Sequence, residues 1–134
     1  MGKHSVRADT EKRTLYFQAS GGFTDEEMRR VLEEYKTETD KFKGEKHLVM
    51  ADMRGLSVMS PAVAKIFAQV IGYGRSRGTA LCFHLSDDTI QSLQAARLAR
   101  MTSPLDSVTV DVVSPEEAER ALEDARASLR ESSQ

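Results

Sequence analysis

The sequence has few of the features that mark several common classes of protein. Cys82 is the one cysteine among 134 residues, so an intrachain disulfide is excluded. No apolar run approaches the length of about 20 residues that a membrane-spanning helix needs, and nothing near the start resembles a signal peptide. The 19 basic and 21 acidic residues are spread along the chain, whereas a nucleic-acid surface would need a one-sided basic excess. These absences predict a cytoplasmic protein that neither spans a membrane nor binds nucleic acid.

The chain also lacks the patterns that carry catalysis or metal binding. His4 and His47 have no partners at ligand spacing, which argues against a metal site. Cys82 lies between Leu81 and Phe83, where a small hydrophobic side chain is expected, and without a second cysteine no redox role is predicted. There is no nucleophile–base pair and no phosphate-binding loop. We therefore predict a protein that is not an enzyme and holds neither a metal nor a cofactor.

A buried strand followed by a capped helix sets the predicted fold. Leu48–Met53 is a nearly unbroken apolar run, which is typical of a parallel strand buried on both faces. A turn at Arg54-Gly55 follows, and Ser60-Pro61 then combines an N-cap hydroxyl with a proline at the first helical position. Apolar residues repeat at helical spacing after it, and Gly72 and Gly74 are expected to cap the end of that helix.

Strands and helices alternate along the rest of the chain. Period-two patterns and β-branched runs predict further strands at 5–8, 15–19, 79–85 and 108–113. Capping signals and apolar stripes predict further helices from Thr24 to about Phe42, from Ser86 to Pro104 and from Ser114 to Leu129. The predicted fold is α/β in the order ββαβαβαβα, with about four helices, all or mostly on one side of a mixed five-stranded sheet. Only the first hairpin should be antiparallel.

The element order and one short segment resemble the STAS domain of the anti-sigma-factor antagonist family. The segment reads Leu56-Ser57-Val58-Met59-Ser60-Pro61-Ala62-Val63, a Leu-Ser-x-Met string followed by a helix start of small residues. Family members typically carry Asp-Ser-Ser-Gly or Asp-Ser-Thr-Gly after the methionine, and one hydroxyl there is the phosphorylation switch. In this chain Pro61 and Ala62 stand at the two hydroxyl positions. The resemblance implies a single STAS-like domain over 1–134, with a core from about residue 5 to about residue 125, a frayed C-terminal tail and no phospho-acceptor motif.

The resemblance further implies a regulator that acts by docking onto a partner protein, such as an anti-sigma factor or a signalling kinase. The docking surface would be the loop after the buried strand together with the start of the next helix. Its residues are Arg54, Leu56, Ser57, Met59, Ser60 and Ala62. Because the matching positions cannot accept a phosphoryl group, binding is predicted to be constitutive, or controlled by abundance or by a ligand.

A second hypothesis is a small-molecule or lipid-binding domain with a pocket under the helices that begin at Thr24 and Ser60. Polar side chains near the carboxyl ends of two strands are separate candidates for ligand contact, in a crevice at the sheet edge where open α/β sheets bind ligands. These crevice candidates are Asp52, His84, Ser86 and Asp87. The simpler interpretation, in which Asp52 caps local amides and His84 is a hydrogen-bonded strand residue, is favoured over a site there.

A homodimer is the last interaction that the sequence leaves open. Domains of the STAS type often pair through a sheet edge or through the central helix. The first strand would be such an edge, and edges without charge invite pairing. Lys3, His4 and Arg7 supply charge there and discourage it.

Overall fold

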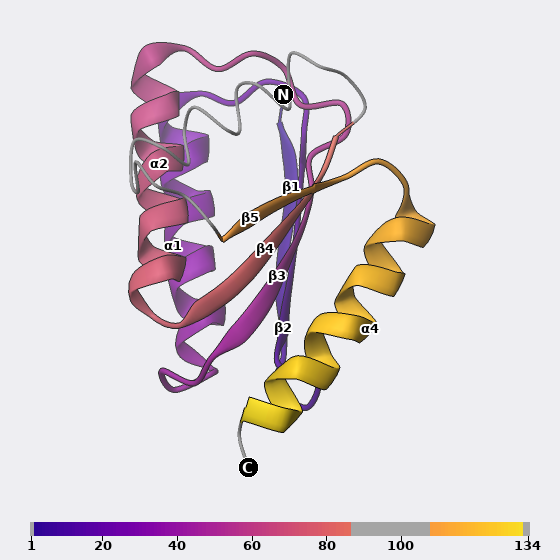
Figure 1. The fold of residues 1–134 in the computed structure, drawn as a ribbon. Helices are drawn as coiled ribbons and strands as arrows, with labels where there is room; N and C mark the ends of the chain where they lie inside the picture. Colours follow the sequence, from indigo (N-terminus) through magenta and orange to yellow (C-terminus); the bar gives the residue numbers. More distant parts are fainter. Residues whose placement is uncertain (1, 87–107, 133–134) are drawn as a thin grey trace.

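A computed structural model describes residues 2–86 and 108–132 as an α/β structure (Figure 1). The strands are β1 (Lys3–Asp9), β2 (Thr14–Ser20), β3 (His47–Asp52), β4 (Thr79–Leu85) and β5 (Thr109–Val112). The described helices are α1 (Asp25–Asp40), α2 (Pro61–Ser76) and α4 (Pro115–Ser132). Apart from Ser86, the helix predicted from Ser86 to Pro104 lies outside the described residues. No helix of the described part is long and apolar enough to cross a membrane.

The sheet is mixed and five-stranded, as predicted, and its strands follow one another in the order β1-β2-β3-β4-β5. β1 and β2 form an antiparallel hairpin, whereas β2, β3, β4 and β5 run parallel to one another. β3 therefore lies in the middle of the sheet, where the apolar run placed it. The chain steps in one direction across the sheet from β2 to β5, so the described strands contain no point at which the order reverses.

α1 and α2 cover one face of the sheet, and α4 crosses the other face (Figure 1). Right-handed crossovers that all step the same way place their helices on the same face, which puts α1 beside α2. α4 follows β5 and packs in the second hydrophobic core, on the opposite face. Two of the three described helices thus share a side, and α4 is the exception that the sequence did not identify.

Each face of the sheet has its own hydrophobic core, and β3 contributes to both. Val49 and Ala51 pack in the core under α1 and α2, while Leu48 and Met50 pack in the core under α4. Successive side chains of a strand point to opposite faces, so a strand covered on both sides needs apolar residues at every position. This double burial explains why the segment before Asp52 reads as an unbroken apolar run.

Two helix ends differ from the sequence prediction. α2 continues through Gly72 and Gly74 to Ser76, so these glycines do not cap it, and Gly78 adopts the positive φ of 112° instead. Gly74 serves packing: a Cβ there would lie 3.3 Å from the Tyr35 ring of α1. α4 continues to Ser132, and its Leu129 is buried, so the core extends past residue 125.

His47 fixes the amino end of β3 to two neighbouring segments. Its ring is fully buried and stacks on Phe42 with a centroid distance of 4.4 Å. Nδ1 lies 3.1 Å from the carbonyl oxygen of Glu45, and Nε2 lies 2.9 Å from the hydroxyl oxygen of Thr79. A neutral ring satisfies both contacts by donating to the carbonyl and accepting from the hydroxyl. Burial lowers the pKa of His47 below its ordinary value, because the charged form would lose its hydration.

The free energy of unfolding is expected to fall as the pH is lowered from 7 towards 5.5. The unfolded chain binds a proton at His47 near the ordinary pKa of about 6.5, whereas the folded chain, with its lowered pKa, does not. The unfolded state therefore gains protons first, and acid favours it. Urea unfolding at the two pH values should show a smaller pH effect in His47→Gln than in the wild type. An equal effect in both proteins would contradict this assignment.

Candidate functional site

The loop after β3 begins with an ion pair between two residues of one turn. Arg54 donates from Nη2 and Nε to the two carboxylate oxygens of Asp52, at 2.8 and 3.0 Å, and from its backbone N–H at 3.2 Å. The Arg54 side chain lowers the pKa of the Asp52 carboxyl, and partial burial opposes this less strongly. Asp52 is therefore an ionised carboxylate that already accepts hydrogen bonds from a guanidinium and a local amide.

Backbone contacts with the loop after β2 fix the shape of this segment. Gly21 N–H donates to the Gly55 carbonyl at 2.9 Å, and Ser57 N–H donates to the Gly21 carbonyl at 3.0 Å. Gly55 adopts a φ of 79°, in the left-handed region that glycine enters without strain. Between these contacts Leu56 forms a parallel bridge with Gly21 and is only 6% exposed. The loop is thus anchored by main-chain hydrogen bonds and by one core side chain.

The side chains of the segment divide into anchors and exposed residues. Of the predicted partner-binding residues, those exposed to solvent are Arg54, Ser57, Ser60 and Ala62. Leu56 lies in the core under α1 and α2, and Met59 is half-buried against it, so these two hold the loop in place. Val58 was not among the predicted contact residues, yet its side chain is 74% exposed.

Ser60 is the N-cap of α2, as its position before Pro61 predicted. Its Oγ accepts a hydrogen bond from Val63 N–H at 3.2 Å, and Pro61 occupies the first helical position. The hydroxyl satisfies a helix-end amide that would otherwise lack a partner within the helix.

Ser60→Ala is expected to lower the free energy of unfolding by about 1 kcal/mol, the usual cost of a lost N-cap. Ser57→Ala is the matched control, because Ser57 is exposed on the same loop and does not cap the helix. Urea unfolding of both variants measures the difference. Equal stability of the two variants would contradict a capping role for Ser60.

The structure does not bring Asp52 and His84 into one crevice. In the β3–β4 register Ala51 pairs with His84, and Asp52 pairs with Leu85. Paired residues of neighbouring strands share a face, so the buried His84 points towards α1 and α2 whereas Asp52 points to the α4 face. Ser86 is half-buried just after β4, and Asp87 lies outside the described residues.

A half-open cavity of about 250 Å³ lies on the α4 face at the carboxyl ends of β2, β3 and β4. Met50, Leu85 and Ala118 supply buried apolar surface, and Asp52 and Arg54 supply charge. The remaining lining residues are Ser5, Tyr16, Phe17, Gln18, Pro115 and Glu119. This position differs from the predicted pocket under the two helices that begin at Thr24 and Ser60.

Aromatic side chains fill the space under α1 and α2, where the second hypothesis placed a ligand. Phe17 contacts Tyr35 edge-on with centroids 5.7 Å apart, and its centroid lies 6.2 Å from that of Phe67. All three rings are buried in the same hydrophobic core. Side chains therefore occupy this part of the interior, and the cavity of about 250 Å³ lies on the other face of the sheet.

Metal coordination finds no support in residues 2–86 and 108–132, which hold no group of three or more His, Cys, Asp or Glu side chains able to bind an ion. Cys82 is half-buried and packs against the core under α1 and α2. Its place in β4 is that of a small hydrophobic residue.

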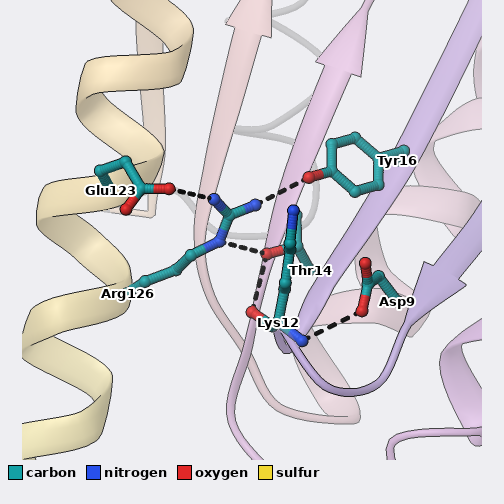
Figure 2. A network of polar contacts seen from close by, with 6 residues as sticks. All are labelled: Asp9, Lys12, Thr14, Tyr16, Glu123 and Arg126. Atoms are coloured by element: carbon teal, nitrogen blue, oxygen red, sulfur yellow. Dashed lines mark hydrogen bonds and ion pairs between the residues drawn. The ribbon is translucent and has the colours of Figure 1, made fainter.

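Sequence reasoning missed Arg126, which joins α4 to β2 (Figure 2). Its side chain is buried, and it donates to Thr14 Oγ1 at 3.2 Å, to Tyr16 Oη at 2.7 Å and to Glu123 Oε1 at 2.8 Å. A signal was present: Arg126 follows Leu122 by four residues and so falls on the apolar stripe of the last helix. A charged residue on a buried stripe indicates a partner across the interface.

Comparisons with known proteins do not place this site in a known family. No family model matches the chain, and neither a curated protein nor a solved structure matches it.

Proposed function

We propose that this chain is a non-enzymatic, regulatory protein-docking domain of STAS type. Its docking loop is the segment 54–62, from Arg54 to the start of α2. The observation that carries the proposal is Val58, a large apolar side chain that is 74% exposed on this loop. Exposed polar residues flank it, namely Arg54, Ser57 and Ser60. An apolar centre within a polar rim is the usual organisation of a protein interface.

The contacts that anchor the docking loop at both ends support the same proposal. Binding is weakened when a loop must first be ordered, so a loop held in one conformation before contact binds at lower entropic cost. Two main-chain hydrogen bonds to Gly21 and the buried Leu56 hold the loop on its amino-terminal side. The Ser60 cap holds it on the helix side. Val58 therefore lies between two anchored ends of the loop.

The resemblance of the segment Leu56–Val63 to the family motif supports the choice of partner class, an anti-sigma factor or a signalling kinase. We expect docking that phosphorylation does not control. Pro61 and Ala62 have no acceptor hydroxyl, and the Ser60 hydroxyl already accepts from Val63 N–H. A substantial phosphorylated fraction at Ser57 or Ser60, found by intact-mass analysis of protein from its native cell, would contradict this expectation.

The docking loop is tested by placing a photo-crosslinking amino acid at position 58 in cells. We expect a defined protein adduct there, and none at Glu11, which lies in the β1–β2 turn, at the other end of the strands from the docking loop. Val58→Asp should weaken binding of the captured protein by about tenfold or more, since it places a charge at the apolar centre. Val113→Asp is the matched control, because Val113 is 82% exposed outside the loop. Equal capture at both positions, or equal effects of the two substitutions, would contradict the proposal.

The cavity on the α4 face favours a second candidate function, the binding of a small molecule. Its volume of about 250 Å³ lies below the range of about 300–1,000 Å³ that is usual for drug-sized ligands, so the ligand would be small. Native mass spectrometry of the purified protein would show a carried ligand as added mass. Ala118→Leu narrows the cavity and should release that ligand. Retention of the ligand in this variant would contradict binding at this cavity.

A further inference from the structure

We propose that the outer edge of β1 is a second docking site, which takes an extended basic segment of a partner protein as an added strand. This site lies between β1 and α1 and is separate from the docking loop. The inference does not depend on the function proposed for that loop, and each can fail alone.

The backbone of β1 offers unpaired groups at its outer edge. Within the described residues β1 pairs with β2 alone. Ala8 N–H donates to Glu38 Oε1 at 3.0 Å, so the main-chain groups of Ala8 point away from β2. Alternate residues of an antiparallel strand share this orientation, which gives His4 and Val6 the same outward N–H and C=O groups. These groups have no hydrogen-bond partner in the described part of the chain, and a strand laid beside them would pair with both residues.

An acidic groove runs along this edge. It measures about 550 Å³ and lies between β1 and α1. Its lining residues are His4, Ser5, Val6, Glu33, Glu34, Thr37 and Glu38, with three carboxylates and neither lysine nor arginine among them. Lysines outside the lining pair with two of the three, Lys41 with Glu38 at 2.6 Å and Lys36 with Glu33 at 3.8 Å, and His4 contacts Glu34. The Glu33 and Glu34 side chains stay 75% and 57% exposed, so both remain accessible to a partner's cations.

Alternate side chains of an added strand would point towards α1, where Glu34 is exposed and Glu38 already bonds Ala8 N–H and Lys41. Glu34 and Glu38 are four residues apart on α1, a rise of about 6 Å. Alternate residues of a strand lie about 6.8 Å apart and point to the same face. A partner strand beside β1 would direct every second side chain towards α1, as Val6 and Ala8 themselves do. A lysine or arginine at such a position would therefore approach Glu34, the 57% exposed carboxylate that contacts His4.

The same charges disfavour a second copy of this chain as the occupant. Two β1 strands paired antiparallel about a twofold axis would place both α1 helices on one face of the joined sheet. Their glutamate rows would then face each other. Arg7 could not neutralise them, because it packs over the Tyr16 ring on the α4 face. The charge pattern thus selects a basic partner.

Glu38 sets the limit of the added strand. Its bond to Ala8 N–H occupies one end of the edge and leaves the stretch from His4 to Val6 for pairing. Burial raises the pKa of the Glu38 carboxyl, but hydrogen bonds from Lys41 and from Ala8 N–H outweigh it, and the pKa is lowered overall. The Glu38 carboxylate therefore stays charged at neutral pH and continues to occupy the N–H of Ala8.

The probe for this site is a synthetic peptide of four Lys-Thr repeats, titrated into the isotope-labelled full chain and followed by NMR. We expect shifts in the amide signals of residues 4–6 and 33–38. A peptide with alternate backbone amides N-methylated keeps the charge but cannot pair as a strand, and it should bind about tenfold more weakly. A Glu-Thr repeat peptide should not bind. Equal binding of the methylated peptide, binding of the acidic peptide, or no binding of the Lys-Thr peptide would overturn the proposal.

Val6→Pro tests the edge from the protein side. Proline removes the outward N–H of Val6 and leaves the ladder to β2 intact, and edge strands tolerate it for this reason. We expect about tenfold weaker peptide binding in Val6→Pro and unchanged binding in the matched variant Val6→Thr. Circular dichroism checks that the variant is folded. If Val6→Pro is unfolded, the comparison with the N-methylated peptide tests the proposal instead. Sedimentation of the protein without peptide could instead show a dimer that Val6→Pro dissociates. That result would overturn the proposal of a basic partner in favour of a second copy of this chain.

Discussion

Arg126→Ala is expected to lower the free energy of unfolding by about 3 kcal/mol, as measured by urea denaturation. The Arg126 side chain bridges α4 and β2 through hydrogen bonds to Thr14 and Tyr16, and bonds Glu123 within α4, in a site that is almost closed to water (Figure 2). Alanine removes those bonds and leaves a cavity between the helix and the sheet, and both effects destabilise the folded chain. Since α4 is the one described helix on this face, losing its fixation to Thr14 and Tyr16 exposes the core beneath it.

Arg126→Met distinguishes the contribution of the Arg126 hydrogen bonds to stability from the contribution of its packing. Methionine fills much of the same volume, and the Thr14 hydroxyl keeps a partner because it also donates to the Lys12 carbonyl at 3.0 Å. We therefore expect Arg126→Met to recover most of the stability, as replacements of buried ionic groups by apolar ones often do. Glu123→Gln should change stability by less than about 0.5 kcal/mol, since the Glu123 side chain is 67% exposed. A loss in Arg126→Met as large as in Arg126→Ala would show that the hydrogen bonds, and not the packing, stabilise α4.

The strand pattern of this protein could be predicted from sequence because local and global signals agree. The unbroken apolar run of β3 reflects burial on both faces, and the alternation in β2 reflects a second face that is less closely covered. The Ser60-Pro61 cap likewise fixes the start of α2. The face that α4 covers could not be read in the same way. Its apolar stripe shows that the helix packs by one side, but both sheet faces offer apolar surface to it.

The positions of the predicted site residues depend on strand parity and on burial, which the sequence motif does not determine. Asp52 and His84 both stand near strand ends, yet a one-residue difference in register places them on opposite faces. Leu56 was predicted to contact a partner, but it anchors the docking loop from inside the core. Exposure of Val58 depends on the path of a loop held by Gly21, a residue distant in sequence. The sequence motif alone shows neither the face to which a strand residue points nor whether a loop side chain is buried or exposed.

The largest effect of a single added methyl group is expected at Gly78. Its φ of 112° lies outside the conformations that residues with a side chain readily adopt. A Cβ there would lie 2.8 Å from the Glu45 carbonyl oxygen and 3.2 Å from the Glu45 carbonyl carbon. Both are backbone atoms, and the Gly78 carbonyl accepts from His47 N–H at 3.0 Å, so neither segment can shift without disturbing the start of β3. Gly78→Ala should lower the free energy of unfolding by about 4 kcal/mol through combined strain and overlap.

Gly44→Ala is the matched control, because it shares the unusual backbone conformation without the crowding. Gly44 has a φ of 81°, and an added Cβ would meet nothing within 4 Å. Its substitution should cost about 1 kcal/mol, the penalty of a left-handed backbone alone. The difference between the two variants in urea unfolding then measures the overlap with Glu45. Similar losses at the two glycines would show that backbone conformation, and not the close approach of residues 45 and 78, makes Gly78 necessary.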